Sequence, residues 1–435
     1  MSHIGTYIMK KWSIFNVTEH IENERTILYN YLNDCIIIIL PELYKLVKKY
    51  EDVNELEEIY PEFFDLLCNN GFVVEDSVDE TELAINLVTQ RLSSPEKLFL
   101  TINPTLDCNL RCWYCYETHT TNCYMNEDIM ERVVKLVERE TQKKDLHTIC
   151  LNFFGGEPLL KAKEIAIPLI QSISNICHKR DKCIRVHFTS NGVLLSKSVL
   201  KSLEELKVNI HFQIPFDGGR IYHNRTKHLP NGKGTYNIIL NNVINALSKN
   251  FKITFRCNYT SENIESFKEL VDDICNIVEE NKEKVLFSLQ RIWQTSPTKD
   301  LYKKEEELQK YIISKGFTKN TNDQKILCNC YADYESSLMI NYNGDIFKCT
   351  ARDFHHNNRI GILGKDGNIL NSDNFFLYKD KKFGKYCLTC RLLPICTVCI
   401  QKKIENDKCP INITSEEIDR LIRMRMKIII NDNIQ

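Results

Sequence analysis

The amino-acid sequence predicts an α/β protein built around a parallel sheet. From residue 98 onward, short strand-like runs alternate with amphipathic helix-like runs, which is the pattern of repeated strand–helix units. The strand-like runs are residues 98–103, 148–154, 184–189, 208–214, 252–258 and 285–289. Units of this kind join parallel strands through right-handed crossovers and carry their chemistry at the carboxyl ends of the strands. Periodicity leaves open whether the sheet is a curved partial barrel or a flat doubly wound sheet.

The segments that flank these units differ in character. Residues 1–95 contain strand-like runs at 11–17, 26–30 and 72–75 and helix-like runs at 41–50 and 53–69, which suggest a small winged-helix-like α+β module. Residues 321–412 are rich in cysteine. Residues 413–435 begin with a capping box and read as a scaffold helix. We therefore expect four parts, at 1–95, 96–320, 321–412 and 413–435.

Composition excludes several classes of protein. A chain of 435 residues with 43% hydrophobic residues can bury a large core, and a formal net charge of −1 gives no global reason to bind nucleic acid. The longest apolar run, residues 35–40, is too short to cross a bilayer. The first residues lack the pattern of a signal peptide. We expect a cytoplasmic protein with no nucleic-acid or membrane partner.

The cysteines indicate metal. There are nineteen, and most fall in residues 108–123 and 328–409. In a large chain without a secretion signal, such clusters favour metal ligation over disulfides. The first cluster follows the first predicted strand and has the spacing Cys108, Cys112, Cys115. Three thiolates can ligate three irons of a [4Fe–4S] cube and leave the fourth iron open, whereas four would close it. Structural zinc is the alternative.

Other polar motifs follow the next predicted strands. The second strand is followed by the sequence GGEP, whose glycines allow close backbone approach and whose glutamate offers a carboxylate to an ammonium group. The candidate residues at the strand ends are Gly155, Gly156 and Glu157, then Ser190 and Asn191, then Asp217 and Arg225, and lastly Arg256. Because parallel strands end at one edge of a sheet, we expect these residues to lie near the three cysteines.

The cysteine spacing, the aromatic Tyr114 before the third cysteine and the GGEP sequence about forty residues later resemble the radical SAM superfamily. The resemblance implies a partial (β/α)6 barrel, a cluster held by the three cysteines, and S-adenosyl-L-methionine bound at its open iron. It implies cofactor contacts from Tyr114, Gly155, Gly156, Glu157, Ser190, Asn191, Arg225 and Arg256. The chain departs from its relatives at Pro215, where they usually have Ser or Thr, and at Lys227, where they usually have Arg; Arg225 is a possible substitute.

The second cysteine field resembles the SPASM domain, an auxiliary-cluster extension of peptide-modifying radical SAM enzymes. Its eight cysteines suffice for two [4Fe–4S] clusters or for two zinc sites. By resemblance, the first auxiliary cluster takes Cys330, Cys349 and Cys399, with Cys328 as the favoured fourth ligand; without Cys328, one iron would stay open to a substrate thiolate. The second cluster takes Cys387, Cys390, Cys396 and Cys409. Only two residues separate Cys396 from Cys399, where relatives usually have three. Three clusters and S-adenosyl-L-methionine are therefore the expected cofactors.

Three functions compete. The first is a maturase that uses a 5′-deoxyadenosyl radical to install a thioether, a carbon–carbon link or an epimerised residue in a ribosomal precursor peptide. Its N-terminal module would hold the leader by strand addition, and ferredoxin or flavodoxin would supply electrons. The second is an anaerobic sulfatase-maturing enzyme, but those carry Asp directly after the cysteine that corresponds to Cys349, where this chain has Thr350. The third is a zinc-stapled binding protein. Asp217 and Asp353 are candidate general acids or bases.

Overall fold

The computed structural model describes residues 8–278, 281–319 and 329–434. The chain forms two compact units. We call residues 94–322 with 331–379 the barrel unit, and residues 1–93 with 323–330 and 380–435 the terminal unit. The four-part division drawn from the sequence stays a prediction. Within the described ranges, no helix is both long enough and apolar enough to span a membrane.

The barrel unit contains one eleven-stranded, mostly parallel sheet, which confirms the predicted fold class. Its first six strands lie side by side in sequence order and pair in parallel: β6 (Lys97–Ile102), β7 (Thr148–Phe153), β8 (Cys183–Thr189), β9 (Asn209–Phe216), β10 (Lys252–Tyr259) and β11 (Val285–Arg291). Two further strands extend the edges in parallel, β12 (Thr318–Lys319) beside β11 and β13 (Ser337–Ile340) beside β6. Antiparallel pairing then adds β14 (Asp345–Phe347), β15 (Gly361–Leu363) and β16 (Ile369–Asn371).

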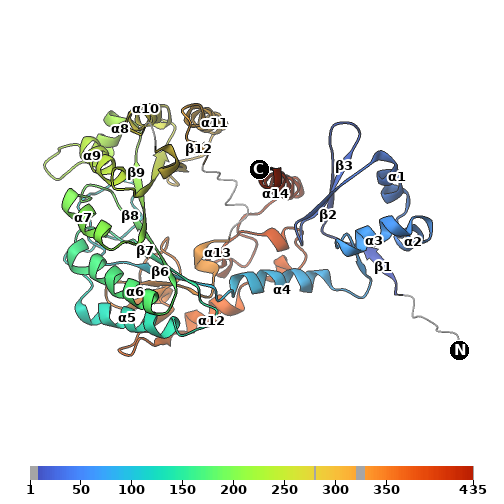
Figure 1. The fold of residues 1–435 in the computed structure, drawn as a ribbon, viewed down its shortest axis with the longest axis horizontal. Helices are drawn as coiled ribbons and strands as arrows, with labels where there is room; N and C mark the ends of the chain where they lie inside the picture. The colour runs from blue at the N-terminus through green and yellow to red at the C-terminus, as the bar shows by residue number, and fades with distance from the viewer. Residues whose placement is uncertain (1–7, 279–280, 320–328, 435) are drawn as a thin grey trace. The chain divides into compact units, whose positions relative to one another are not determined.

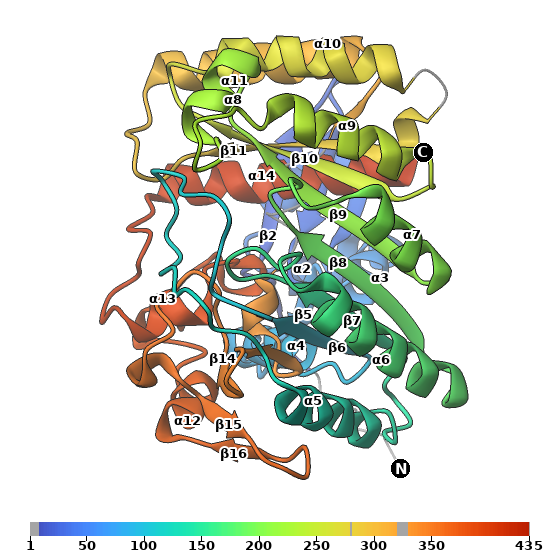
Figure 2. The ribbon, with the colours of Figure 1, turned by 90° about the vertical axis from the view of Figure 1, so that its left-hand side faces the viewer.

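Helices cover the outer face of this sheet (Figures 1 and 2). They are α5 (Glu127–Glu140), α6 (Ile167–Lys179), α7 (Lys197–Glu205), α8 (Arg220–Thr226), α9 (Tyr236–Leu247), α10 (Phe267–Ile277) and α11 (Lys299–Ser314), with α12 (Asp373–Asp380) after the last strand. Helix α5 begins where the Asn126 side chain accepts a hydrogen bond from the amide of Ile129, a normal N-cap. Its apolar stripe, which includes Val133 and Val137, is completely buried.

Side chains alternate along the strands between the helix-covered core and a cavity on the other face of the sheet. On β9, Ile210, Phe212 and Ile214 are buried in the helix-covered core, whereas the intervening Asn209, His211 and Gln213 line a cavity on the other face. Parallel strands buried on both faces read instead as continuous apolar runs. The alternation therefore indicates a partial barrel with a polar interior, which is the choice implied by the family resemblance.

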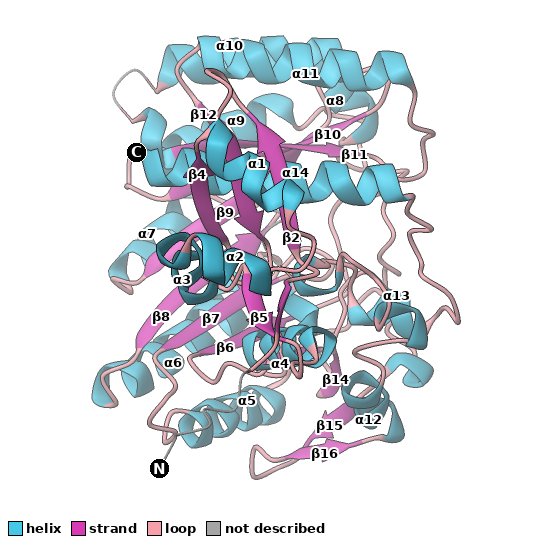
Figure 3. Ribbon diagram, turned by 90° about the vertical axis from the view of Figure 1, so that its right-hand side faces the viewer, coloured by secondary structure: helices cyan, strands magenta, loops and turns pink. Residues whose placement is uncertain are grey.

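The terminal unit contains a three-stranded antiparallel sheet of β2 (Asn16–His20), β3 (Thr26–Asn30) and β4 (Cys35–Ile39), and a pair of β1 (Lys10–Trp12) with β5 (Val73–Glu75). Its helices are α1 (Pro41–Lys49), α2 (Asn54–Ile59), α3 (Pro61–Asn69), α4 (Glu80–Leu92), α13 (Ile400–Ile404) and α14 (Ser415–Ile434) (Figure 3). Two sequence-based predictions were wrong here. The single strand at 11–17 is β1 and β2, and the single helix at 53–69 is α2 and α3, because Pro61 disfavours helical geometry at Tyr60.

Both ends of the sequence contribute to the core of the terminal unit. Phe15, Tyr29 and Tyr31 pack in one buried cluster with Ile422 and Met426 of α14. The predicted capping box at the start of α14 is confirmed by reciprocal hydrogen bonds between Thr414 and Glu417, of 3.0 and 3.2 Å. The N-terminal segment is therefore structurally dependent on the C-terminal helix.

Candidate active site

The three cysteines of the first cluster lie in the loop between β6 and α5 and line one cavity of about 160 Å³. We call it the cysteine cavity. The structure brings to it most of the residues predicted from sequence: Cys108, Cys112, Cys115, Tyr114, Gly155, Gly156, Ser190, Asn191 and Arg256. It lies at the carboxyl ends of the parallel strands, as expected for this class of fold. Pro215 also lines it, so the fourth strand offers no hydroxyl group there.

The two glycines hold the GGEP loop against the start of the cysteine loop. Gly155 has φ +103°, and a side chain at Gly156 would collide with the carbonyl of Asp107. The amide of Glu157 donates to the Asp107 carbonyl over 2.8 Å. Close packing of two backbone segments therefore requires glycine here, whatever ligand the cavity holds.

The Glu157 carboxylate is fully buried, and its oxygens are already hydrogen-bonded to other groups of the protein. It accepts hydrogen bonds from the Ser190 hydroxyl (2.8 Å), the Asn191 amide (2.8 Å) and the Leu159 amide (2.9 Å). Burial raises the pKa of Glu157 to about 7, against the opposing effect of these hydrogen bonds. The carboxylate ties the ends of β7 and β8 together and does not line the cysteine cavity. Its contact with a methionine amino group stays a prediction.

A buried polar network supports Tyr114. The Tyr114 hydroxyl donates to the Asp217 carboxylate over 2.7 Å and accepts from the Lys227 ammonium over 2.6 Å, and Lys227 also pairs directly with Asp217. Asn258 donates to the Tyr114 hydroxyl over 2.9 Å. The side chains of Lys227 and Asp217 are each only 2% exposed. A lysine and an aspartate 10 residues apart thus anchor an aromatic ring between two cluster cysteines.

Asp217 keeps Lys227 in its charged form despite burial. Burial alone lowers the pKa of Lys227, but the carboxylate of Asp217, with Tyr114 and Cys112, outweighs it and raises that pKa. Neighbouring groups fix the pair further. The Asn263 side chain donates to the Asp217 carbonyl over 3.0 Å, and His223 accepts from the Asp217 amide over 3.4 Å. Asp217 is an anchoring group in this arrangement, and its suggested acid–base role stays a prediction.

The thiols of the cavity fit the chemistry of an iron–sulfur cluster. Burial, followed by the charge of Glu157, raises the pKa of Cys108 to about 12, and burial also raises the pKa of Cys112 and Cys115. Thiolates are the species that bind iron, so cluster binding must release these protons. The Lys227 ammonium acts in the opposite direction to burial at Cys112. The three thiols line one cavity, as a three-cysteine ligand set requires, although no three His, Cys, Asp or Glu side chains in the described part of the chain are grouped as a preformed metal site.

The structure adds residues that the sequence reasoning missed. Glu117 and His119 line the cysteine cavity, and within the described part of the chain Glu117 Oε1 is buried without a hydrogen-bond partner. Burial and the nearby Asp353 raise the pKa of Glu117 to about 8. Their position just after the third cysteine was the available signal. Arg225, by contrast, is exposed, rests 5.4 Å from the Tyr222 ring and does not line the cavity.

A second cavity, of about 190 Å³, lies within the terminal unit and is lined by all four cysteines predicted for the second auxiliary cluster, Cys387, Cys390, Cys396 and Cys409. We call it the four-cysteine cavity. Burial raises the pKa of Cys387, Cys390 and Cys396. The other predicted set stays untested: Cys328 lies outside the described residues, Cys330 and Cys399 belong to the terminal unit, and Cys349 belongs to the barrel unit. No disulfide joins the cysteines in the described part of the chain.

Comparisons with known proteins agree with this geometry. Residues 102–274 match the family model of the radical SAM superfamily. The radical SAM cyclopropyl synthase TigE of Paramaledivibacter caminithermalis is 22% identical over 452 aligned positions, which cover 94% of this chain and 91% of that protein. Among solved structures, anSMEcpe with bound AdoMet and the Kp18Cys peptide has a TM-score of 0.57 at 18% identity, over 77% of this chain and 98% of that one. SuiB of Streptococcus suis bound to the precursor peptide SuiA has a TM-score of 0.51 at 18% identity, over 89% and 95%. At these identities the structural likeness shows the fold alone.

Proposed function

Because residues 102–274 of this chain are a radical SAM domain, we propose that the protein is a maturase that modifies a ribosomally made precursor peptide. The observation that carries the proposal is the convergence of Cys108, Cys112 and Cys115 on one cavity with the GGEP glycines. When bound there, a [4Fe–4S] cluster and S-adenosyl-L-methionine supply a 5′-deoxyadenosyl radical that can remove hydrogen from an unactivated carbon.

The residues of this chain contribute binding, orientation and exclusion of water. The three cysteines would hold the cluster, and Ser190 and Asn191 border the space beside it. The Asn191 amide group donates to Asn109 over 2.8 Å and lies 3.8 Å from the Cys108 sulfur, so it helps to orient that thiol. The buried Lys227–Asp217 pair keeps Tyr114, and hence the cysteine loop, in one conformation.

Space for a peptide supports the choice of substrate. A cavity of about 860 Å³, which we call the lumen cavity, fills the interior of the partial barrel. This cavity adjoins the cysteine cavity, because the two share the lining residues Tyr116, Phe154, Thr189 and Arg256. Its volume is within the range of pockets that enclose a small ligand or a few residues of peptide. The solved structures of anSMEcpe and SuiB named above contain peptides.

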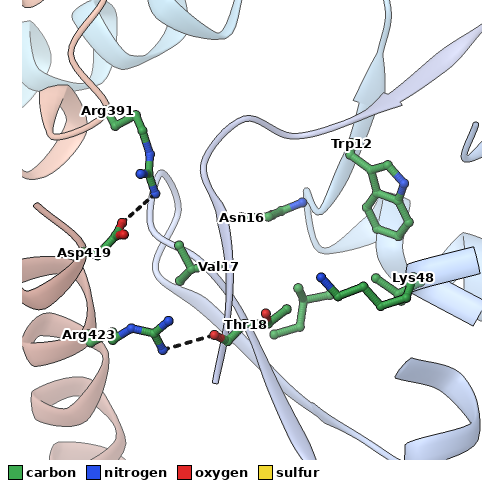
Figure 4. Close-up of a pocket in the computed structure, with 10 residues that line it drawn as sticks. Trp12, Asn16, Val17, Thr18, Lys48, Arg391, Asp419 and Arg423 are labelled. Carbon is green, nitrogen blue, oxygen red and sulfur yellow. Dashed lines mark hydrogen bonds and ion pairs between the residues drawn. The ribbon is translucent and has the colours of Figure 1, made fainter. Parts of the chain in front are cut away.

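A groove in the terminal unit offers a docking place for a leader segment. It has a volume of about 350 Å³ and lies along β2, which is an edge strand of its sheet (Figure 4). Arg423 donates to the carbonyl of Thr18 over 3.1 Å, and Arg391 pairs with Asp419 over 2.9 Å. Lys48 also lines the groove. An extended peptide that added a strand to β2 would lie among these cations.

The four cysteines that line the four-cysteine cavity favour the proposal of one auxiliary cluster there. We propose a second auxiliary cluster on Cys328, Cys330, Cys349 and Cys399. Ferredoxin or flavodoxin would deliver the electrons. Maturation of a sulfatase is not favoured, because Thr350 occupies the position of the expected aspartate. The Thr350 hydroxyl accepts a hydrogen bond from Tyr331 over 2.8 Å.

Cofactor cleavage tests the assignment. Protein purified without oxygen should contain iron and labile sulfide and should convert S-adenosyl-L-methionine to methionine and 5′-deoxyadenosine when reduced. Joint replacement of Cys108, Cys112 and Cys115 by alanine should abolish this cleavage, whereas Cys183→Ala, at an exposed thiol outside both cavities, should leave it intact. Zinc in place of iron, or cleavage by the triple variant, would refute the proposal.

Leader docking needs point substitutions. Deletion of residues 1–90 would expose the core that Phe15 and Tyr29 share with α14, so a loss of binding would be ambiguous. Lys48→Glu in the groove should weaken binding of synthetic peptides encoded by short reading frames beside the gene. Lys45→Glu, on an exposed part of α1 outside the groove, is the matched control. Equal affinity of the two variants would exclude the groove.

A further inference from the structure

The lumen cavity carries an unbalanced charge. Three cationic side chains, Arg185, Lys252 and Arg256, line it, and no aspartate or glutamate is among its described lining residues. The cations come from β8 and β10, on either side of β9. A concave surface lined by one sign of charge attracts a ligand of the opposite sign. The lumen cavity is therefore suited to an anion.

These cations have no acidic partner in the described part of the chain. Arg185 and Lys252 are exposed and form no ion pair or hydrogen bond with a described residue. Arg256 donates from Nε to the Asn258 side chain over 3.0 Å and forms no ion pair there. Other cations of this unit do pair with carboxylates, as Lys249 does with Glu204 and Lys315 with Asp272. The lumen cations remain available to a ligand.

Two imidazoles complete the lining. His187 and His211 meet edge to face, with ring centroids 5.0 Å apart, and His211 shares a hydrogen bond of 2.8 Å with Thr254. Burial lowers the pKa of both rings. The nearby His211 lowers the pKa of His187 further, and the nearby Lys252 does the same for His211. Neutral imidazoles can donate to a carboxylate and can also accept from a peptide amide. The side-chain amides of Asn152, Asn209 and Gln213, which also line the cavity, can likewise both donate and accept hydrogen bonds.

Strand register locates the exposed cations relative to the cysteine cavity. Arg185 lies opposite Asn209 on β9, and Lys252 lies opposite His211. Thr189 lies four residues after Arg185 on β8 and borders the cysteine cavity. Arg256, four residues after Lys252 on β10, borders it as well. At about 3.3 Å per residue, this separation is roughly 13 Å. An extended substrate needs about four residues to span it.

We propose that the lumen cavity binds a carboxylate of the substrate peptide at Arg185 and Lys252, about three to five residues away from the residue that reacts beside the cysteine cavity. The inference rests on the proposed peptide substrate and adds to it a rule for the substrate sequence. An acidic side chain and a terminal carboxylate share this chemistry. A phosphate group is the less suitable anion, because no glycine-rich loop or helix N-terminus is among the described lining residues.

Small carboxylates test the site without requiring turnover. The probes are N-acetyl-glutamate methylamide for an acidic side chain, N-acetyl-alanine for a terminal carboxylate, and N-acetyl-glutamine methylamide as the uncharged match. Calorimetric titration of the iron-loaded protein should show binding of at least one carboxylate and weaker binding of the amide. The affinity should fall when salt is raised. The carboxylate that binds more tightly identifies the source.

Charge-removing variants locate the binding. Arg185→Gln and Lys252→Gln should each weaken carboxylate binding about two- to fivefold, because an ion pair at an exposed side chain contributes up to about 1 kcal/mol. Lys201→Gln, which removes the same charge from an exposed position on α7, should have no effect. Both lumen residues are exposed, so their replacement leaves the core intact. Absence of carboxylate binding, equal affinities in all three variants, or tighter binding of inorganic triphosphate would overturn the proposal.

The two proposals can fail separately. Arg185→Gln and Lys252→Gln should leave reductive cleavage of S-adenosyl-L-methionine unchanged, because neither residue lines the cysteine cavity. If cleavage and peptide modification occur but the carboxylate probes do not bind, only the lumen inference is wrong. If carboxylates bind at Arg185 and Lys252 but no peptide is modified, the proposed function is wrong and the anion site stands.

Discussion

Replacement of Lys227 by methionine tests how the cysteine loop is held in place. The substitution keeps most of the volume of the side chain but removes the ammonium group that Asp217 and Tyr114 bind. Both members of the ion pair are 2% exposed, so Asp217 would be left as a buried, unpaired charge. Breaking a buried pair in this way costs about 3–5 kcal/mol. For a unit of this size each kcal/mol lowers Tm by roughly 2–4 °C, so the expected fall is roughly 6–20 °C.

Calorimetry of the metal-free protein measures this effect, and a surface pair provides the control. Lys249→Met breaks the ion pair with Glu204, whose members are 29% and 45% exposed, and should cost less than about 1 kcal/mol. Asp217→Asn should resemble Lys227→Met, because it strands the lysine instead. In the double variant the two losses should not add, with a coupling energy of up to about 3 kcal/mol.

The amount of iron that the protein retains provides a second measurement. Because Tyr114 lies between Cys112 and Cys115, a loosened Tyr114 should reduce the iron that remains after gel filtration, whereas Lys249→Met should leave it unchanged. Single variants as stable as the surface control, or losses that add fully in the double variant, would show that the pair does not anchor the loop.

Three further results are expected. Gly156→Ala should lower both Tm and iron content, because its methyl group would collide with the Asp107 carbonyl; an unchanged Tm would contradict the close packing of the two loops. Burial lowers the pKa of His187 to about 4 from an ordinary 6.5, so the unfolded chain binds more protons between these values and stability should fall as pH drops from 6.5 to 4. His187→Phe should reduce that acid sensitivity by up to roughly 3 kcal/mol, as measured by Tm across this pH range. Cys396→Ser should lower iron content by up to about four atoms per chain, relative to Cys183→Ser, while cleavage of S-adenosyl-L-methionine persists.

Short-range patterns predicted much of the fold and the site. All six central strands occur where apolar alternation placed them, because period-two burial is a property of consecutive residues. Cys108, Cys112 and Cys115 share one loop, so their spacing already implied a common ligand. Local patterns were less informative in the terminal unit, where Pro61 divides a helix that looked continuous from its apolar spacing.

Pairings between distant residues could not be derived in this way. The sequence suggested Arg225 as the cation near the cofactor, but the structure turns Arg225 to the surface and buries Lys227 beside Tyr114, 113 positions away in the sequence. Glu157 likewise bonds to Ser190, just after the next strand, instead of lining the cavity. Which side chain enters the site depends on the phase of α8 and on strand register, and neither is encoded by a motif of a few residues.

The sequence by itself determined the alternating strands and helices, the cysteine spacing and the glycines that bring two loops together, because each depends on neighbours along the chain. Only the tertiary structure decided that the barrel interior is cationic and that a lysine–aspartate pair supports the cysteine loop. Both depend on charges that separate strands and helices bring together: Arg185 and Lys252 are exposed and unpaired in the lumen, whereas burial and pairing set the energies of Lys227 and Asp217.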